Sequence, residues 1–207
     1  MKKKMLKMIM YNKEFQKILL VDIKDYIKLS DKYKIGGKNG KGKEYIINTN
    51  KLIFEGEYLK GRKNGIGKQY DKNGELEFEG EYINGIRNGK GKEYNTYSRT
   101  LEFEGEYLNG KRWKGKEYYF EGDLKFEGEY LNGKRWNGKM YDLKDNIIFE
   151  IKNGNGKGKE FYANGNLEFE GEYKNGEKNG ISKEYSYYKN GKLEFEGEYL
   201  NGERNGK

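Results

Sequence analysis

The pentapeptide Phe-Glu-Gly-Glu-Tyr constrains the fold of this chain more than any other feature, because it occurs six times. The copies begin at Phe54, Phe78, Phe103, Phe126, Phe169 and Phe195. With a degenerate copy at Phe149, the steps between successive phenylalanines are 24, 25, 23, 23, 20 and 26 residues. A period of this size is typical of repeat arrays, in which each unit buries its face against the next.

One period, from Leu76 to Tyr94, has the pattern of a β-hairpin. Side chains alternate between the two faces of a strand, which predicts one face with Leu76, Phe78, Gly80 and Tyr82. The other face then carries Glu77, Glu79 and Glu81. The return segment Gly89-Lys90-Gly91-Lys92 alternates in the same way, so rows of glutamate oppose rows of lysine. Its glycines leave room for aromatic rings of a neighbouring hairpin.

Asn-Gly dipeptides supply the turns, because both residues tolerate positive φ. Of the 31 glycines, 16 follow an asparagine. The pattern predicts hairpin turns at sites that include Asn84-Gly85, Asn88-Gly89, Asn109-Gly110 and Asn175-Gly176. A second set marks connections between hairpins, at Asn73-Gly74, Asn164-Gly165 and Asn190-Gly191. We therefore expect an all-β fold, an elongated array of about seven stacked antiparallel β-hairpins over residues 33–207, the last unit incomplete.

The net charge of +8 is concentrated at the N-terminus. Residues 1–34 carry ten lysines and four acids, which leaves 42 − 10 = 32 bases and 34 − 4 = 30 acids in the other 173 residues. The array is thus almost neutral and has no concentrated basic stripe, so nucleic acid is not an expected partner. Cysteine is absent, which excludes disulfides and thiolate metal sites and suits a reducing compartment.

Residues 1–32 depart from the repeat and have apolar residues near helical spacing, with lysines between them. One interpretation is a short N-terminal helical cap that covers the first exposed hairpin edge. The other is a basic amphipathic helix lying on an anionic membrane, anchored by Lys2, Lys3, Lys4 and Lys7. The longest apolar run, Ile18-Leu19-Leu20-Val21, is too short for a membrane span. We expect a cytoplasmic protein, peripheral to the membrane under the second interpretation.

The sequence does not predict an enzyme. It has no histidine or cysteine to act as a base or nucleophile. The paired glutamates recur in unit after unit, as in Glu79/Glu81 and Glu104/Glu106, whereas catalysis needs one special environment. No cofactor or metal site is expected either.

Two tryptophans interrupt the repeat, Trp113 and Trp136, each preceded by an arginine, Arg112 and Arg135. Each tryptophan replaces part of an Asn-Gly turn, and adjacent hairpins would bring the two indoles near each other at one edge. Tryptophan beside arginine is the composition of interface hot spots, so these four residues form a candidate site for a protein partner. The alternative is that each ring covers its own shortened turn.

Two further irregularities have predicted consequences. The unit Phe149–Tyr162 lacks the Gly-Glu-Tyr of its first strand, so it kinks the array, divides it into two blocks, or is a drifted repeat that preserves the pairing. The unfinished unit from Phe195 to Lys207 leaves an open edge, where we expect a homodimer contact.

The units resemble the MORN repeat family, whose pattern is aromatic-x-Gly-x-aromatic, a glycine-bearing loop and a Gly-x-Gly strand. Phe78-x-Gly80-x-Tyr82 followed by Asn88-Gly89-Lys90-Gly91 matches it position by position, and the likeness covers about residues 33–207. Tyrosine stands where the family usually has tryptophan, and Asn-Gly where it has His-Gly; YwqK-like antitoxin repeats are similar in both respects. The resemblance implies a non-catalytic scaffold for protein–protein or membrane-surface interaction. The alternatives are an antitoxin that neutralises a partner toxin and a membrane tether acting through the basic N-terminus.

Overall fold

The structure is a computed structural model that describes residues 32–162, 164–188 and 191–205. The expected helical cap over residues 1–32, with Lys2, Lys3, Lys4 and Lys7, lies outside the described residues except for its last position. The described residues form sixteen strands and no helix, so the predicted all-β fold is confirmed. No helix in this part of the chain is therefore long and apolar enough to span a membrane.

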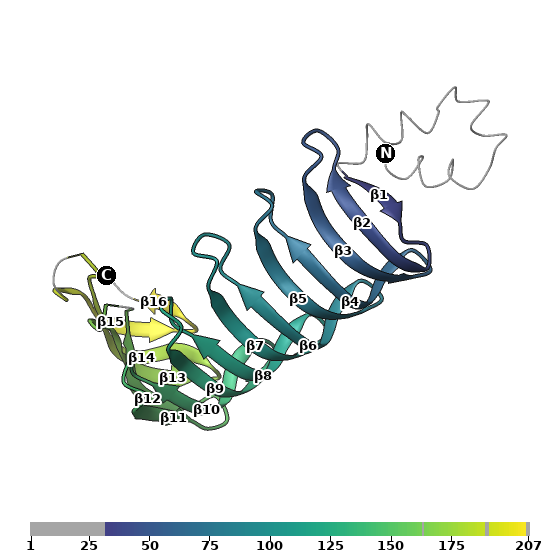
Figure 1. The fold of residues 1–207 in the computed structure, drawn as a ribbon. Helices are drawn as coiled ribbons and strands as arrows, with labels where there is room; N and C mark the ends of the chain where they lie inside the picture. The colour runs from purple at the N-terminus through teal and green to yellow at the C-terminus, as the bar shows by residue number, and fades with distance from the viewer. Residues whose placement is uncertain (1–31, 163, 189–190, 206–207) are drawn as a thin grey trace.

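Every strand pairs antiparallel with its sequence neighbours, within two sheets. The eleven strands of the first sheet are β1 (Lys32–Gly36), β2 (Gly40–Ile46), β3 (Leu52–Leu59), β4 (Arg62–Tyr70), β5 (Leu76–Ile83), β6 (Ile86–Tyr94), β7 (Leu101–Leu108), β8 (Lys111–Tyr118), β9 (Leu124–Leu131), β10 (Lys134–Tyr141) and β11 (Ile147–Ile151). The second sheet contains β12 (Gly156–Phe161), β13 (Leu167–Lys174), β14 (Glu177–Tyr185), β15 (Leu193–Leu200) and β16 (Glu203–Asn205). The strands lie side by side in chain order (Figure 1).

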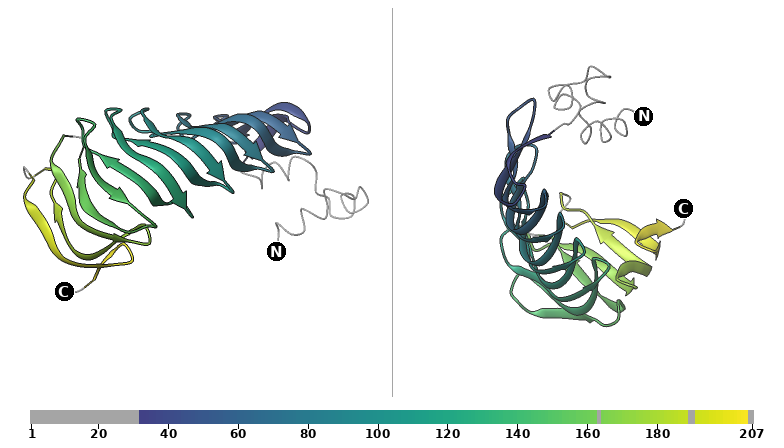
Figure 2. Two further views of the ribbon diagram at one scale, coloured as in Figure 1. Left: turned by 90° about the horizontal axis from the view of Figure 1, so that it is seen from below. Right: turned by 90° about the vertical axis from the view of Figure 1, so that its right-hand side faces the viewer.

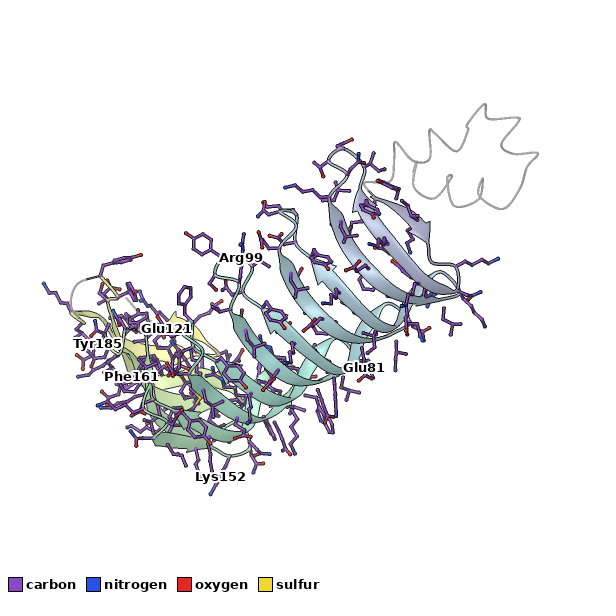
Figure 3. The ribbon with its side chains drawn as sticks, in the orientation of Figure 1. Glu81, Arg99, Glu121, Lys152, Phe161 and Tyr185 are labelled. Carbon is purple, nitrogen blue, oxygen red and sulfur yellow. The ribbon has the colours of Figure 1, made fainter. Side chains whose placement is uncertain are left out.

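The hairpin turns all lie along one edge of the array, the turn edge, and the connections between hairpins along the other, the connector edge. Glu81, near a turn, and Arg99, in a connection, lie at these opposite edges (Figure 3). The turn residues Asn84 (φ 53°) and Gly85 (φ 91°) are both left-handed, as a two-residue type I′ turn requires. Adjacent turns are bonded together, because the Gly85 N–H donates to the Lys63 carbonyl at 2.7 Å. The Asn-Gly turn prediction is thus confirmed at Asn84-Gly85.

The prediction of a turn at Asn88-Gly89 is wrong. Both residues lie within β6, in a bulge between the pairs Tyr82↔Arg87 and Gly80↔Gly91. The Glu81 carboxylate opposite the bulge accepts the Lys90 N–H at 3.2 Å. The Asn88 side chain accepts the N–H of Asn109, in the next hairpin turn, at 3.2 Å. The asparagine therefore links hairpins instead of making a turn.

The core is a row of phenylalanine and tyrosine rings on one face of the array, the aromatic face. Phe78 is fully buried and makes edge contacts with Tyr82 in its own strand, at 5.5 Å between ring centroids, and with Tyr107 of the next unit, at 5.1 Å. A Cβ added to Gly91 would lie 2.4 Å from Cζ of Phe78, so the ring occupies the space that this glycine leaves. The ring over each glycine therefore comes from the same hairpin, which corrects the expectation of a neighbouring one.

A bulge at the start of each forward strand also changes the predicted faces. Phe78 pairs with Gln69, but the next pair is Leu76↔Tyr70, so Glu77 is an extra residue. Glu77 accepts a hydrogen bond at 2.8 Å from Arg87, whose guanidinium lies 4.2 Å from the centroid of the Phe78 ring. Glu77 thus lies on the aromatic face, and the alternation that assigned Leu76 to that face is reversed by the bulge.

The irregular unit divides the array into two blocks, as one of the three interpretations predicted. Strands β11 and β12 are not paired in a ladder, and an isolated bridge, Lys152↔Asn155, lies in the turn between them. In the regular units two glycines face each other, and a Cβ on Gly80 would lie 2.6 Å from Cα of Gly91. Ile151 stands where the repeat has that glycine and is buried, so its side chain prevents the close approach. The sheets meet at a corner there and together have a C-shaped outline in end view (Figure 2).

Among the strands that the structure describes, β1 pairs only with β2, and β16 only with β15, so each has one edge without a described partner. Unpaired strand edges can template contact with another chain. The homodimer contact expected at the last hairpin stays a prediction.

Candidate binding surface

The two tryptophans mark shortened bulges in β8 and β10. The turns before them, at Asn109-Gly110 and Asn132-Gly133, are intact, with positive φ at all four residues. In β8 the bulge consists of Trp113 alone, between the pairs Tyr107↔Arg112 and Glu106↔Lys114. In the previous unit the corresponding bulge consists of the segment Asn88–Lys90. The tryptophan therefore replaces an Asn-Gly bulge, and the turn itself keeps its length.

The indoles have different surroundings. A Cβ on Gly154 would lie 2.7 Å from Cζ3 of Trp136, so this ring packs on the turn of the next hairpin. The Trp136 carbonyl also accepts the Gly154 N–H at 2.8 Å. Trp113 is 48% exposed. The two indoles do not contact each other among the ring contacts of the described residues. Of the two tryptophans, Trp113 is therefore the one that is available to a partner.

Arg112 and Arg135 belong to a chain of charges on the aromatic face. Arg112 donates to Glu93 at 2.7 Å and lies 3.5 Å from Glu117. Arg135 donates to Glu117 and, at 2.7 Å, to Glu160 of β12. The chain Glu93–Arg112–Glu117–Arg135–Glu160 therefore crosses the corner between the two sheets.

The pKa shifts in this chain agree with a set of charges held in place. Burial alone would raise the pKa of Glu117, but the charges of Arg135 and Arg112 outweigh it and hold that pKa at about 2. Burial likewise opposes ionisation of Glu160, and the charge of Arg135 still lowers the pKa of Glu160. Charges in a poorly solvated place need such partners. The geometry assigns both arginines a structural role, and their role in binding stays a prediction.

The opposite face of the array, the charged face, presents the glutamate and lysine rows predicted from the sequence. In most return strands a lysine reaches the glutamate of the following hairpin, as in Lys68–Glu79 at 3.2 Å and Lys92–Glu104 at 3.5 Å. The Tyr94 hydroxyl also donates to Glu79 at 2.8 Å, which lowers the pKa of Glu79 together with Lys68. The lysine–glutamate pairs join one hairpin to the next, and the Tyr94–Glu79 bond lies within one hairpin.

A groove follows the glycine row along the charged face. One part of about 610 Å³ extends from β4 to β9, and another of about 640 Å³ extends from β1 to β4. Both parts are lined by Ile66 and Lys68, so they are continuous. Glycine backbone forms the floor, and the charged rows form two walls. This groove was missed at the sequence level, although the Gly-x-Gly pattern flanked by charges is its signature.

Half-exposed aliphatic residues gather at the turn edge. They precede or follow the turns of consecutive hairpins and are 47–51% exposed: Leu59, Ile83, Ile86, Leu108 and Leu131. We call this row the apolar stripe. Trp113, three residues after a turn, adds an exposed indole to the same edge. Among the described residues no cluster of histidine, cysteine or acidic side chains could hold a metal ion.

Comparison with known protein families identifies several of the repeats. The MORN repeat variant matches residues 63–84, 154–175 and 178–201, and the MORN repeat matches residues 78–99. The match at residues 63–84 covers most of β4, a connection and β5. The match at residues 78–99 begins at Phe78, within β5, and continues past β6. The two models thus divide the same repeat at different points. No curated protein matches the chain.

Proposed function

The chain is a MORN repeat protein, and on that premise we propose that it is a non-catalytic scaffold that binds another protein through its turn edge. Repeats of this family are commonly modules for protein or membrane interaction and are generally non-catalytic. Neutralisation of a toxin, as in YwqK-like antitoxins, would be one case of such binding.

The apolar stripe carries the proposal. Four of its five aliphatic side chains, all but that of Ile86, recur at the position before the turn in consecutive hairpins, so they form a row. Contiguous exposed apolar surface with a polar rim is typical of interaction sites. Trp113 supplies the large, half-exposed ring that interface hot spots favour. Fixed spacing along a rigid sheet would let several residues contact one partner together.

A pulldown from the native cell extract tests this proposal. The Leu108→Ser/Trp113→Ala variant removes two residues of the turn edge, both about half exposed. The matched control, Tyr97→Ser/Phe120→Ser, removes two exposed rings from the connector edge. We expect the turn-edge variant to lose the partners that wild type and control retain, while all three proteins have the same melting temperature. Equal recovery by the turn-edge variant would refute the proposal.

A further inference from the structure

One turn of the array lacks the hydrogen bonds that tie its neighbours together. Six turns along the turn edge have the sequence Asn-Gly with positive φ at both residues, and their asparagines are Asn84, Asn109, Asn132, Asn153, Asn175 and Asn201. In five of these turns the glycine N–H donates to a carbonyl of the preceding unit at 2.7–2.9 Å. The exception is Gly133, whose N–H has no hydrogen-bond acceptor among the described residues.

The preceding turn, Asn109-Gly110, shows which contacts are missing. Its Gly110 N–H donates to the Arg87 carbonyl at 2.9 Å, and its Asn109 N–H donates to the side chain of Asn88 at 3.2 Å. Both acceptors lie at the wide bulge of β6. A Cβ added to Gly110 would lie 3.2 Å from Cγ2 of Ile86, so this turn lies close against the turn before it.

The turn Asn132-Gly133 follows a bulge that consists of Trp113 alone. An indole is a donor only, so this side chain cannot accept the Asn132 N–H as asparagine does one unit earlier. In the part of the chain that the structure describes, neither N–H of the turn has a hydrogen-bond partner. A Cβ added to Gly133 would lie 3.9 Å from its nearest neighbour, on Lys111, and both turn residues are exposed to solvent.

The two turns are otherwise matched. Phe103–Trp113 and Phe126–Trp136 have the same sequence, Phe-Glu-Gly-Glu-Tyr-Leu-Asn-Gly-Lys-Arg-Trp. The backbone conformation is also the same, with φ at 51° in Asn109 and 56° in Asn132. A difference in reactivity between these two asparagines would therefore arise from contacts between units and not from local sequence.

We propose that Asn132-Gly133 is a site of spontaneous deamidation, modified faster in the folded chain than Asn109-Gly110. The Gly133 nitrogen forms a bond to Cγ of Asn132, the Cγ–Nδ2 bond breaks, and the side-chain amide leaves as ammonia with the proton of the Gly133 nitrogen. Water then opens the cyclic imide at either carbonyl and gives aspartate or isoaspartate. Ring closure requires the turn to change its dihedral angles, and a hydrogen bond from either N–H opposes that change.

The products would alter the turn edge. Both carry a carboxylate next to Leu131 of the apolar stripe, where the unmodified chain has a neutral amide. Isoaspartate also adds one methylene to the backbone, which is incompatible with the two-residue type I′ turn. This inference goes beyond the proposed function and does not depend on it.

Mass spectrometry of the full chain, incubated at pH 7 without denaturant, tests the proposal. Trypsin places the two asparagines in the separate peptides Thr100–Lys111 and Phe126–Lys134, and conversion of the amide to the acid is followed in each. Two hydrogen bonds of ordinary net strength slow the opening of a turn by about fivefold or more, so we expect Asn132 to react faster than Asn109 by at least that factor.

The same chain in concentrated urea is the control. Without folded structure the two rates should become equal, because the surrounding sequences are identical. Equal rates in the folded chain would overturn the proposal. The same ratio of rates with and without urea would also overturn it, since folded contacts would then not be the cause.

Protein variants test the role of the bulge. Asn88→Trp combined with deletion of Gly89 gives β6 the Arg-Trp-Lys sequence of β8. In this variant we expect Asn109 to react as fast as Asn132, whose own rate stays unchanged. Asn88→Ala, which removes only the side-chain acceptor, should give a smaller increase at Asn109. With circular dichroism showing a retained fold, no increase at Asn109 in either variant would overturn the proposal.

Discussion

Replacing Arg135 with methionine tests whether the buried charge chain stabilises the corner between the sheets. The guanidinium joins Glu117 to Glu160 and lies 5.3 Å from the centroid of the Phe126 ring. Removing one partner of a buried pair costs about 3–5 kcal/mol, because the remaining charge is left without compensation. Glu117 keeps Arg112 at 3.5 Å, and methionine keeps part of the packing. We therefore expect a loss near the lower limit, about 3 kcal/mol.

Urea denaturation followed by circular dichroism at pH 7 measures this loss. The matched control is Arg99→Met, which also removes one arginine from an ion pair, to Glu75 at 2.6 Å. The Arg99 side chain is 73% exposed, and pairs of this kind contribute under about 1 kcal/mol. The double variant Arg135→Met/Glu160→Gln removes one uncompensated charge as well. It should regain about 1–2 kcal/mol of the loss.

Two results would refute this reasoning. If Arg135→Met lost no more free energy of unfolding than Arg99→Met, the buried chain would not stabilise the fold. If adding Glu160→Gln to Arg135→Met lowered the free energy of unfolding further, the uncompensated charge on Glu160 would not be the cause of the destabilisation by Arg135→Met.

Three further predictions follow from the core, the charge chain and the N-terminus. Gly91→Ala should lower the free energy of unfolding by about 1–3 kcal/mol in urea, because its Cβ would lie 2.4 Å from the Phe78 ring; an equal loss in Lys92→Ala, an exposed neighbour, would contradict this. In the folded chain the pKa of Glu117 is about 2, below its ordinary value of 4.5. The ionised carboxylate therefore contributes to the free energy of unfolding at pH values above 4.5, and this contribution is lost as the pH falls toward 2. Urea titrations across that range should show this decline, and an identical decline in Glu117→Gln would count against it. If the N-terminal lysines anchor the chain to anionic membrane, deleting residues 1–13 or adding salt should abolish flotation with phosphatidylserine liposomes; binding unaffected by both would exclude the tether.

Much of the fold could be predicted because the repeat makes local rules recur. Asn84-Gly85 has the dihedral angles of a hairpin turn for reasons confined to those two residues. The phenylalanine of each unit is buried because apolar residues on one strand face must find one another. Asn88-Gly89 has the same local chemistry but lies in a bulge. Which dipeptide becomes the turn depends on the register of the whole hairpin.

The candidate site was less predictable, because its residues act through partners distant in sequence. Trp136 and Trp113 look equivalent in the chain, yet Trp136 packs on Gly154 at the corner and Trp113 remains half exposed. Arg135 reaches Glu160, 25 residues later, across the corner at which the sheet of β11 ends and that of β12 begins. The sequence marks these positions as exceptions without indicating their contacts.

The sequence by itself determined the period, the hairpin and the faces of the strand from Phe78 to Tyr82, since alternation and turn chemistry operate within a single unit. Tertiary structure decided what the units form together. Ile151 is buried at a position where the regular units have glycine, and the two sheets meet at a corner there; across that corner Arg135 reaches Glu160. Both depend on distances between neighbouring units, which packing sets and local sequence does not.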